Sequence, residues 1–175
     1  MSKKIITILL GSPRKDGNTE TLAEALARGA EENGCEVRRV RLQGKKLNGC
    51  LDCRHCWATG APCVQKDDMG EVYEAIADAD VVVLASPLYF YSWSTQIKPV
   101  WDRLLPFFAE NSKIDVRGKK AVLISAAGDT DAECILGREG IIQTRLRLHE
   151  MGDSRRNIRA RHVSEGRRSK RRAEI

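Results

Sequence analysis

The sequence lacks the features that direct a chain into or across a membrane. No apolar run reaches the roughly 18 residues that a membrane-spanning helix needs. Residues 1–10 lead directly into Gly11-Ser12-Pro13, without the small-residue cleavage site of a secretory signal. We therefore expect a cytoplasmic protein without a membrane partner.

Residues 1–137 also lack an excess of positive charge, although the net charge of the whole chain is +6. Residues 138–175 hold twelve Lys or Arg against five Asp or Glu, and this segment accounts for the whole positive excess. Nucleic-acid partners are therefore not expected, because the rest of the chain has no electrostatic bias toward them. Residues 151–175 also lack interleaved aromatic residues, so we expect an Arg-rich tail that is solvated or disordered.

Groups with the spacing of acid-base catalysts are missing as well. The three histidines, His55, His149 and His162, have no partner at a useful spacing. Lys98, Asp102 and Arg103 have the spacing of an ion pair on a helix, which favours a structural role. We therefore assign no catalytic side chain.

What the sequence does contain is an alternation of strands and helices. Apolar runs at 5–10 and 81–86 predict buried parallel strands, 37–42 an edge strand, and 119–127 a fourth strand. Helices are expected from Asn18, from Asp67-Asp68, over about 94–108 and over 132–149. The first would be capped by Asn18 and Thr19 and would have an apolar face of Leu22, Ala25, Leu26 and Ala30.

This alternation predicts a doubly wound parallel sheet in a three-layer α/β/α arrangement. We expect one domain over 1–150, with a cysteine-rich loop at 47–66. Beyond Gly152 only Ile158, Val163 and Ile175 are strongly apolar. We therefore expect an abbreviated or divergent C-terminal end.

The turn after the first strand, residues 11–19, is suited to an anion. It lacks the Lys-Ser/Thr of a Walker A loop and the spacing of G-x-G-x-x-G, so a monophosphate fits it better than a nucleotide polyphosphate. Helix N-H groups and the side chains of Ser12, Arg14, Asn18, Thr19 and Thr21 could bind the phosphate. The alternative is an ordinary turn with a helix cap.

Two further loops are expected at the same sheet edge. Residues 86–93 contain several aromatics that could cover a flat ring, and 125–129 are small enough for a ring to lie on the backbone. Alternatively, Phe90 and Trp93 could pack internally or form a subunit contact.

Four cysteines, Cys50, Cys53, Cys56 and Cys63, lie within fourteen residues. Compact runs of this kind hold Fe-S clusters, whereas structural zinc more often uses two separated Cys-x2-Cys pairs. Zinc, with His55 as a spare ligand, and free or redox-active thiols remain as alternatives. Cys35 and Cys134 are interpreted as buried small apolar residues.

Taken together, these motifs resemble the NADPH-dependent FMN reductase and iron-sulfur flavoprotein family, which has a flavodoxin-like fold. The resemblance covers about residues 3–145 and is carried by Gly11-Ser12-Pro13-Arg14, Gly17-Asn18-Thr19, Cys50-x-x-Cys53-x-x-Cys56, Asp67-Asp68-Met69, Ser86-Pro87-Leu88-Tyr89-Phe90 and Lys98-x-x-x-Asp102-Arg103.

The resemblance implies FMN as cofactor, NAD(P)H as electron donor, and a homodimer or dimer of dimers with the flavin near a subunit boundary. It also implies a [4Fe-4S] cluster at the four cysteines. The residues expected to bind FMN are Ser12, Arg14, Asn18, Thr19, Thr21, Pro87, Leu88, Tyr89, Phe90, Ser92, Ser125, Ala126, Gly128 and Asp129.

The predicted function is an FMN-dependent oxidoreductase that takes hydride from NAD(P)H and reduces a flavin, quinone or protein acceptor. One alternative is an iron-sulfur flavoprotein that carries electrons through its cluster. An alternative of another class is a noncatalytic zinc or nucleic-acid binding module.

Overall fold

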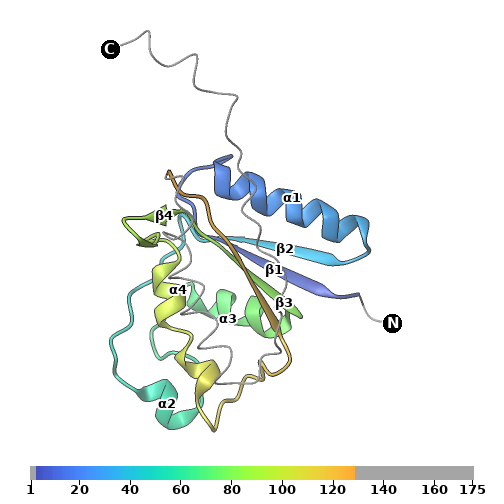
Figure 1. Ribbon diagram of the computed structural model, residues 1–175. Coiled ribbons are helices and arrows are strands. Elements are labelled where there is room, and N and C mark those ends of the chain that lie inside the picture. The colour runs from blue at the N-terminus through green and yellow to red at the C-terminus, as the bar shows by residue number, and fades with distance from the viewer. Residues whose placement is uncertain (1–2, 129–175) are drawn as a thin grey trace, which may run out of the picture.

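The computed structural model describes residues 3–128, which form a parallel sheet with helices on both faces (Figure 1). The sheet order is β2-β1-β3-β6. Its strands are β1 (Ile5–Leu10), β2 (Glu36–Arg41), β3 (Val81–Ala85) and β6 (Lys120–Ile124). A two-stranded antiparallel hairpin, β4 (Leu88–Tyr89) and β5 (Ser92–Trp93), follows β3. The helices are α1 (Asn18–Glu32), α2 (His55–Thr59), α3 (Met69–Asp78), α4 (Lys98–Asp102) and a 3-10 helix, η1 (Leu105–Phe108).

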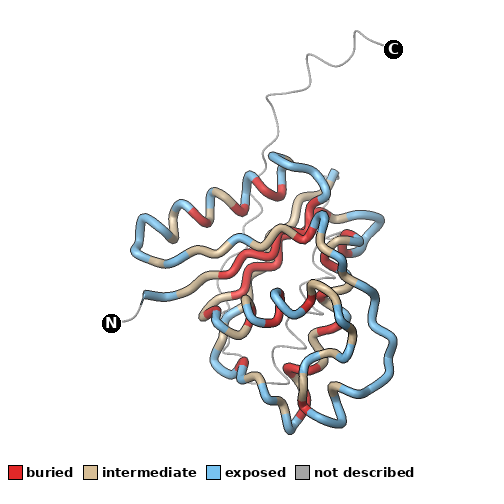
Figure 2. Tube along the Cα trace, turned by 180° about the vertical axis from the view of Figure 1, so that it is seen from behind, coloured by how far each residue is buried: buried red, intermediate tan, exposed pale blue. Residues whose placement is uncertain are grey.

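Alternating strand residues build a core on each face of the sheet. Ile8 and Leu10 of β1 pack with Ala23 and Ala27 of α1, whereas Leu9 joins the larger core with α3 and α4 on the other face. Buried residues therefore run along the centre of the sheet (Figure 2). This arrangement confirms the predicted α/β fold with three layers.

The order in which strands are added to the sheet reverses at β1, because β2 pairs with one side of β1 and β3 with the other, while all three strands run parallel. Ligands of open α/β sheets bind at the carboxyl ends of the strands at such a reversal. Gly11 immediately follows β1 at this point. A Cβ added there would lie 2.8 Å from the Ile97 Cβ and 3.1 Å from the Ala85 oxygen, so only glycine fits without a shift.

The predicted apolar face of the first helix was right at Leu26, which packs half-buried against the core, and wrong at Leu22 and Ala25. Leu22 is 45% exposed, while Thr19, Ala23 and Ala27 are buried. The small side chains of Ala23 and Ala27 allow the helix to approach the sheet closely. The helix cap also differs, because Gly17 is the N-cap residue and makes no side-chain cap bond.

The single helix predicted over 94–108 was also wrong. The segment instead forms α4 and η1, with Arg103 and Leu104 between them. Pro106 explains the break, because it has no N-H to donate to the Asp102 oxygen, as a continuous α-helix would require. The helix expected at 132–149, the domain end at 150 and the tail 151–175 lie outside the described residues.

The cysteine-rich loop is fastened where its two ends meet and again near its middle. At the ends, the Lys46 N-H donates to Asp68 Oδ2 (2.7 Å) and the Asp68 N-H donates to the Lys46 oxygen (3.0 Å). Farther along, the Lys113 N-H donates to the Gly60 oxygen (2.9 Å) and Asn111 Nδ2 donates to the Ala58 oxygen (3.0 Å). The loop thus contains a short helix, α2, and has a defined path. No helix within residues 3–128 has the length and apolarity to cross a membrane.

A buried ion pair lies beneath this loop. Arg103 Nη1 and Nη2 lie 2.6 and 2.9 Å from the two Asp67 carboxylate oxygens, and the side chains are 1% and 2% exposed respectively. Asp67 precedes α3 and Arg103 follows α4, so the pair joins two helices.

We predict that Gly11→Ala destabilises the fold by about 1–3 kcal/mol, because the methyl group must displace Ile97 or the backbone at Ala85. Gly29→Ala is the matched control. Gly29 lies within α1 with no neighbouring atom within 4 Å of its added Cβ, so alanine there should stabilise the helix by about 0.5–1 kcal/mol. Urea unfolding of both variants measures the difference, and equal effects would contradict the close approach at Gly11.

We also predict that Asp67→Asn lowers the free energy of unfolding by about 3–5 kcal/mol, because it leaves the Arg103 guanidinium buried without its counter-ion. Asp115→Asn is the control, since Asp115 forms an exposed ion pair with Arg117 and its loss should have little effect. Denaturant unfolding of the two variants compares them. Equal stabilities would show that the buried pair is not needed for folding.

Candidate functional site

Three loops meet at the carboxyl edge of the sheet, as the sequence predicted. The Gly11 N-H donates to the Ala85 oxygen (2.7 Å), joining the loop after β1 to the end of β3. Ser125 Oγ donates to the Ser86 oxygen (2.9 Å), and the Leu88 N-H donates to the Ala126 oxygen (2.9 Å). These bonds hold the loops after β1, β3 and β6 together as one surface.

Two serines that the sequence analysis did not assign hold this surface from below. Ser86 and Ser94 are fully buried; the Ser94 N-H donates to Ser86 Oγ (3.2 Å), and Ser94 Oγ donates to the Gly11 oxygen. Buried hydroxyl groups need such partners. The available signal was their polarity within an otherwise apolar and aromatic segment.

The loop after β1 presents both buried and exposed polar groups. Ser12 and Thr19 are buried, whereas Arg14, Asn18 and Thr21 are exposed. Ser12 Oγ accepts the Arg14 N-H (3.2 Å), and Thr21 Oγ1 donates to the Gly17 oxygen (3.1 Å). The first N-H groups of α1 lack partners within the helix, so the loop can bind an anion.

Glu20 organises this loop and was also missed by the sequence analysis. Its carboxylate accepts the Asp16 N-H (2.8 Å) and pairs with Arg41 of β2. Asp16 has a φ of 57°, in the left-handed region, so the bond from its N-H secures an unfavourable backbone conformation. Pairing with Arg41 compensates a negative charge that would otherwise repel an anion in the loop. A Glu three residues after a helix cap was the available signal.

The β4–β5 hairpin turns through Phe90 and Tyr91, with φ values of 46° and 60°. Left-handed backbone at both turn residues matches a type I′ turn, which strongly favours Asn and Gly. Instead, aromatic side chains project outward here, with Phe90 96% and Tyr91 71% exposed. Strain of this kind concentrates at functional sites.

Of the neighbouring aromatic residues, Trp93 is packed in the interior and Tyr89 is exposed. Trp93 is buried, with its ring centroid 5.1 Å from that of Trp101, so internal packing accounts for it. Tyr89 is 41% exposed, Leu88 is half-buried, Pro87 is buried and Ser92 is exposed. In the third loop, Ser125 and Ala126 are half-buried and Gly128 is exposed, while Asp129 lies outside the described residues.

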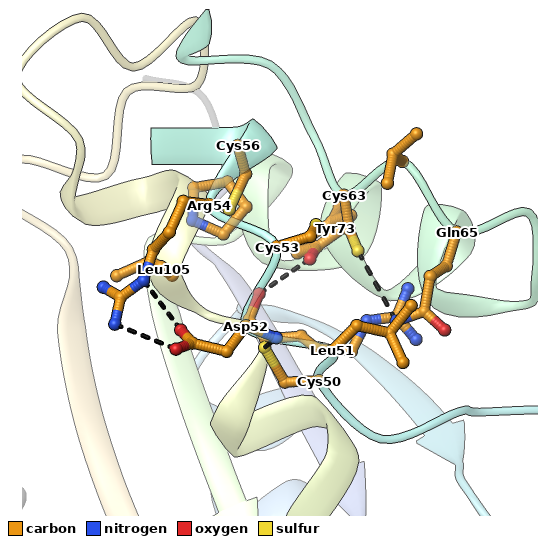
Figure 3. Close-up of a pocket in the computed structure, with 13 residues that line it drawn as sticks. Cys50, Leu51, Asp52, Cys53, Arg54, Cys56, Cys63, Gln65, Tyr73 and Leu105 are labelled. Carbon is orange, nitrogen blue, oxygen red and sulfur yellow. Dashed lines mark hydrogen bonds and ion pairs between the residues drawn. The ribbon is translucent and has the colours of Figure 1, made fainter. Parts of the chain in front are cut away.

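The four cysteines line one pocket (Figure 3). Cys50 and Cys53 are exposed, and Cys56 and Cys63 are half-buried. Burial, followed by the nearby charge of Cys63, raises the pKa of Cys56. Within residues 3–128 no three His, Cys, Asp or Glu side chains are already arranged to hold a metal ion. Cys35 is half-buried, not fully buried as predicted, and Cys134 lies outside the described residues.

Tyr73 and Arg103 form part of the wall of the same pocket. Tyr73 Oη donates to the Arg103 oxygen (2.7 Å), and burial raises the pKa of this phenol. Burial alone would raise the pKa of Asp67, but hydrogen bonds from Arg103 and from the Asn48 and Met69 N-H groups lower it below its usual value. The predicted Lys98–Asp102 ion pair is present (2.6 Å), whereas Arg103 pairs with Asp67 instead.

Comparison with known proteins agrees with this architecture. The sequence model of the NADPH-dependent FMN reductase family matches residues 4–134. An iron-sulfur flavoprotein of Archaeoglobus fulgidus is 42% identical over 99 residues, covering 57% of this chain and 44% of that protein. A second from the same organism is 37% identical over 145 residues, covering 83% of this chain and 71% of that protein. The chain spans 44% and 59% of the lengths of the first two curated relatives that it matches.

Solved structures show the same fold. NAD(P)H:quinone oxidoreductase from Methanothermobacter marburgensis has a TM-score of 0.61 at 20% identity, covering 86% of this chain and 78% of that one. FerB from Paracoccus denitrificans also has a TM-score of 0.61 at 20% identity, covering 91% and 81%. The sheet, the three joined loops and the match over residues 4–134 together establish that the chain belongs to the NADPH-dependent FMN reductase family.

Proposed function

We propose that the protein is an FMN-dependent oxidoreductase that takes hydride from NAD(P)H and reduces a flavin, quinone or protein acceptor. The observation that carries the proposal is the joining of three loops at the carboxyl edge of the sheet, in a chain of the FMN reductase family. Bound FMN would supply the hydride and electron chemistry. The residues of this chain then have to bind, orient and partly cover it.

The loop after β1 would hold the phosphate. Arg14 brings an exposed positive charge, and the N-terminus of α1 offers N-H groups and the positive end of the helix dipole. Asn18, Thr19 and Thr21 lie in the first turn, where their hydroxyl and amide groups could add hydrogen bonds. Ser12 would fix the loop through the Arg14 N-H.

The other two loops would hold the ring. Residues 87–92 would provide the aromatic cover from Tyr89 and Phe90 and backbone groups from Pro87, Leu88 and Ser92, while Ser125, Ala126, Gly128 and Asp129 would lie on its far side. The high exposure of Phe90 supports a surface that is completed by a ligand or by a second copy of the chain. A homodimer or dimer of dimers therefore remains part of the proposal, as does a cytoplasmic location, in which free thiols would stay reduced.

The second candidate function is electron transfer through a [4Fe-4S] cluster held by Cys50, Cys53, Cys56 and Cys63. Two observations support it. The four sulfur-bearing side chains line one pocket, and the relatives from Archaeoglobus fulgidus are iron-sulfur flavoproteins. Thiolates are the ligands that such clusters use.

Arg14→Gln is predicted to weaken FMN binding by about ten- to a hundredfold, because it removes a charge-assisted contact of the kind that contributes about 1.5–3 kcal/mol. Riboflavin, which has no phosphate, should bind the variant and the unaltered protein equally. Lys15→Gln, an exposed neighbouring charge, is the control and should have a smaller effect. Fluorescence titrations measure both ligands, and an equal loss of riboflavin and FMN affinity would count against a phosphate site here.

Cys53→Ser is predicted to lower iron and acid-labile sulfide in protein purified without oxygen, because a cluster would lose one of four ligands. Cys35→Ser is the control, since Cys35 lies before β2 and outside the pocket. Elemental analysis with the visible spectrum gives the result. Absence of iron and sulfide from the unaltered protein would rule out the second candidate function.

A further inference from the structure

The buried guanidinium of Arg103 has a donor without an acceptor. Arg103 is 2% exposed, and its Nη1 donates to Asp67 Oδ2 (2.6 Å) and the Asn48 oxygen (3.0 Å), while Nη2 donates to Asp67 Oδ1 (2.9 Å). Its Nε has no hydrogen-bond partner within residues 3–128. A buried donor left unpaired costs about 1–3 kcal/mol, which makes a partner in the adjacent pocket favourable.

The ion pair with Asp67 does not use this donor. Besides its two bonds from Arg103, the Asp67 carboxylate accepts the N-H groups of Asn48 (2.9 Å) and Met69 (3.2 Å). Its oxygens are therefore satisfied by four donors. Asp67 therefore fixes the orientation of the guanidinium through Nη1 and Nη2, and it does not accept a hydrogen bond from Nε.

Arg103 is also part of the wall of the cysteine pocket. It lines the pocket together with all four cysteines, and Figure 3 shows the Cys63 sulfur directed into it. Burial lowers the pKa of Arg103, but hydrogen bonding to Asp67 and the nearby Cys63 raise it. Tyr73, whose hydroxyl holds the Arg103 backbone, lines it too. A rigid positive charge and an unused N-H therefore lie beside a group of thiols.

We propose that Arg103 is a positioning residue for the sulfur site, donating to the Cys63 sulfur and stabilising the negative charge that the site gains on reduction. The inference rests on the second candidate function. Reduction of a cluster held by these thiolates would add one electron, which bound flavin would supply. A positive charge and an N-H to sulfur bond both stabilise the reduced form and raise the reduction potential.

The test replaces the buried pair by neutral groups of similar shape, Asp67→Asn with Arg103→Gln, so that no unpaired buried charge remains. Arg103→Lys retains the charge without the planar fork. Lys98→Gln removes an exposed charge from the same segment, outside the pocket, as the control. The midpoint potential of the cluster is measured in the FMN-loaded protein by anaerobic redox titration, together with iron and sulfide content.

We expect the double variant to lower the equilibrium constant for cluster reduction by about tenfold, which is about 59 mV more negative for a one-electron couple. Arg103→Lys should shift the potential in the same direction by a smaller amount, and Lys98→Gln should leave it unchanged. If the double variant does not fold, the midpoint potential of the Arg103→Lys variant tests the proposal instead. A negative shift supports the proposal and an unchanged potential overturns it.

Two outcomes separate this inference from the function on which it rests. A complete cluster with the same potential in all variants overturns the role of Arg103 and leaves the iron-sulfur function standing. Unaltered protein without iron and sulfide overturns both.

Discussion

The buried ion pair between Asp67 and Arg103 is the interaction on which the rest of the described structure most depends. It fixes the end of α4 against the start of α3 and, through Asn48, the beginning of the cysteine-rich loop. Burying two charges has a large desolvation cost, which is recovered only with full hydrogen bonding and good geometry. The bidentate geometry and the two backbone donors to Asp67 meet that condition. The pair therefore defines one arrangement of these segments rather than many.

Residues 94–103 connect the two candidate sites. At one end of this segment, Ser94 donates to the Gly11 oxygen and contacts Ser86 at the three-loop edge. In the middle, Ile97 packs against the space where Gly11 has no side chain. At the other end, Arg103 forms part of the wall of the cysteine pocket. A shift of α4 would therefore alter both sites.

The sequence was sufficient to predict the sheet and the meeting of its loops. Continuous apolar runs at β1 and β3 indicated buried parallel strands, and the carboxyl ends of parallel strands share one edge. The face of α1 was predicted wrongly at Leu22, because Leu22 is more hydrophobic than Ala23, although Ala23 is the residue buried against the sheet. The periodicity of a sequence shows which positions are hydrophobic, but it does not show how much space the folded protein leaves for each side chain.

The contacts between distant segments could not be predicted. Arg103 lies one residue from Asp102, and helical spacing pointed to an ion pair within the segment, whereas its partner lies 36 residues earlier. Likewise, the pairing of Glu20 with Arg41 depends on how β2 lies beside α1. The cysteine spacing located the pocket, but Tyr73 and Arg103 join it only through tertiary packing.

The most direct test of the central claim is an anaerobic titration of the FMN-loaded protein with NADPH and, separately, with NADH, followed by the visible absorption of the flavin. We predict that at least one nicotinamide bleaches the flavin bands in proportion to the amount added. A bound flavin that neither nicotinamide reduces, but that a reduced ferredoxin does reduce, would contradict the proposed NAD(P)H-dependent function.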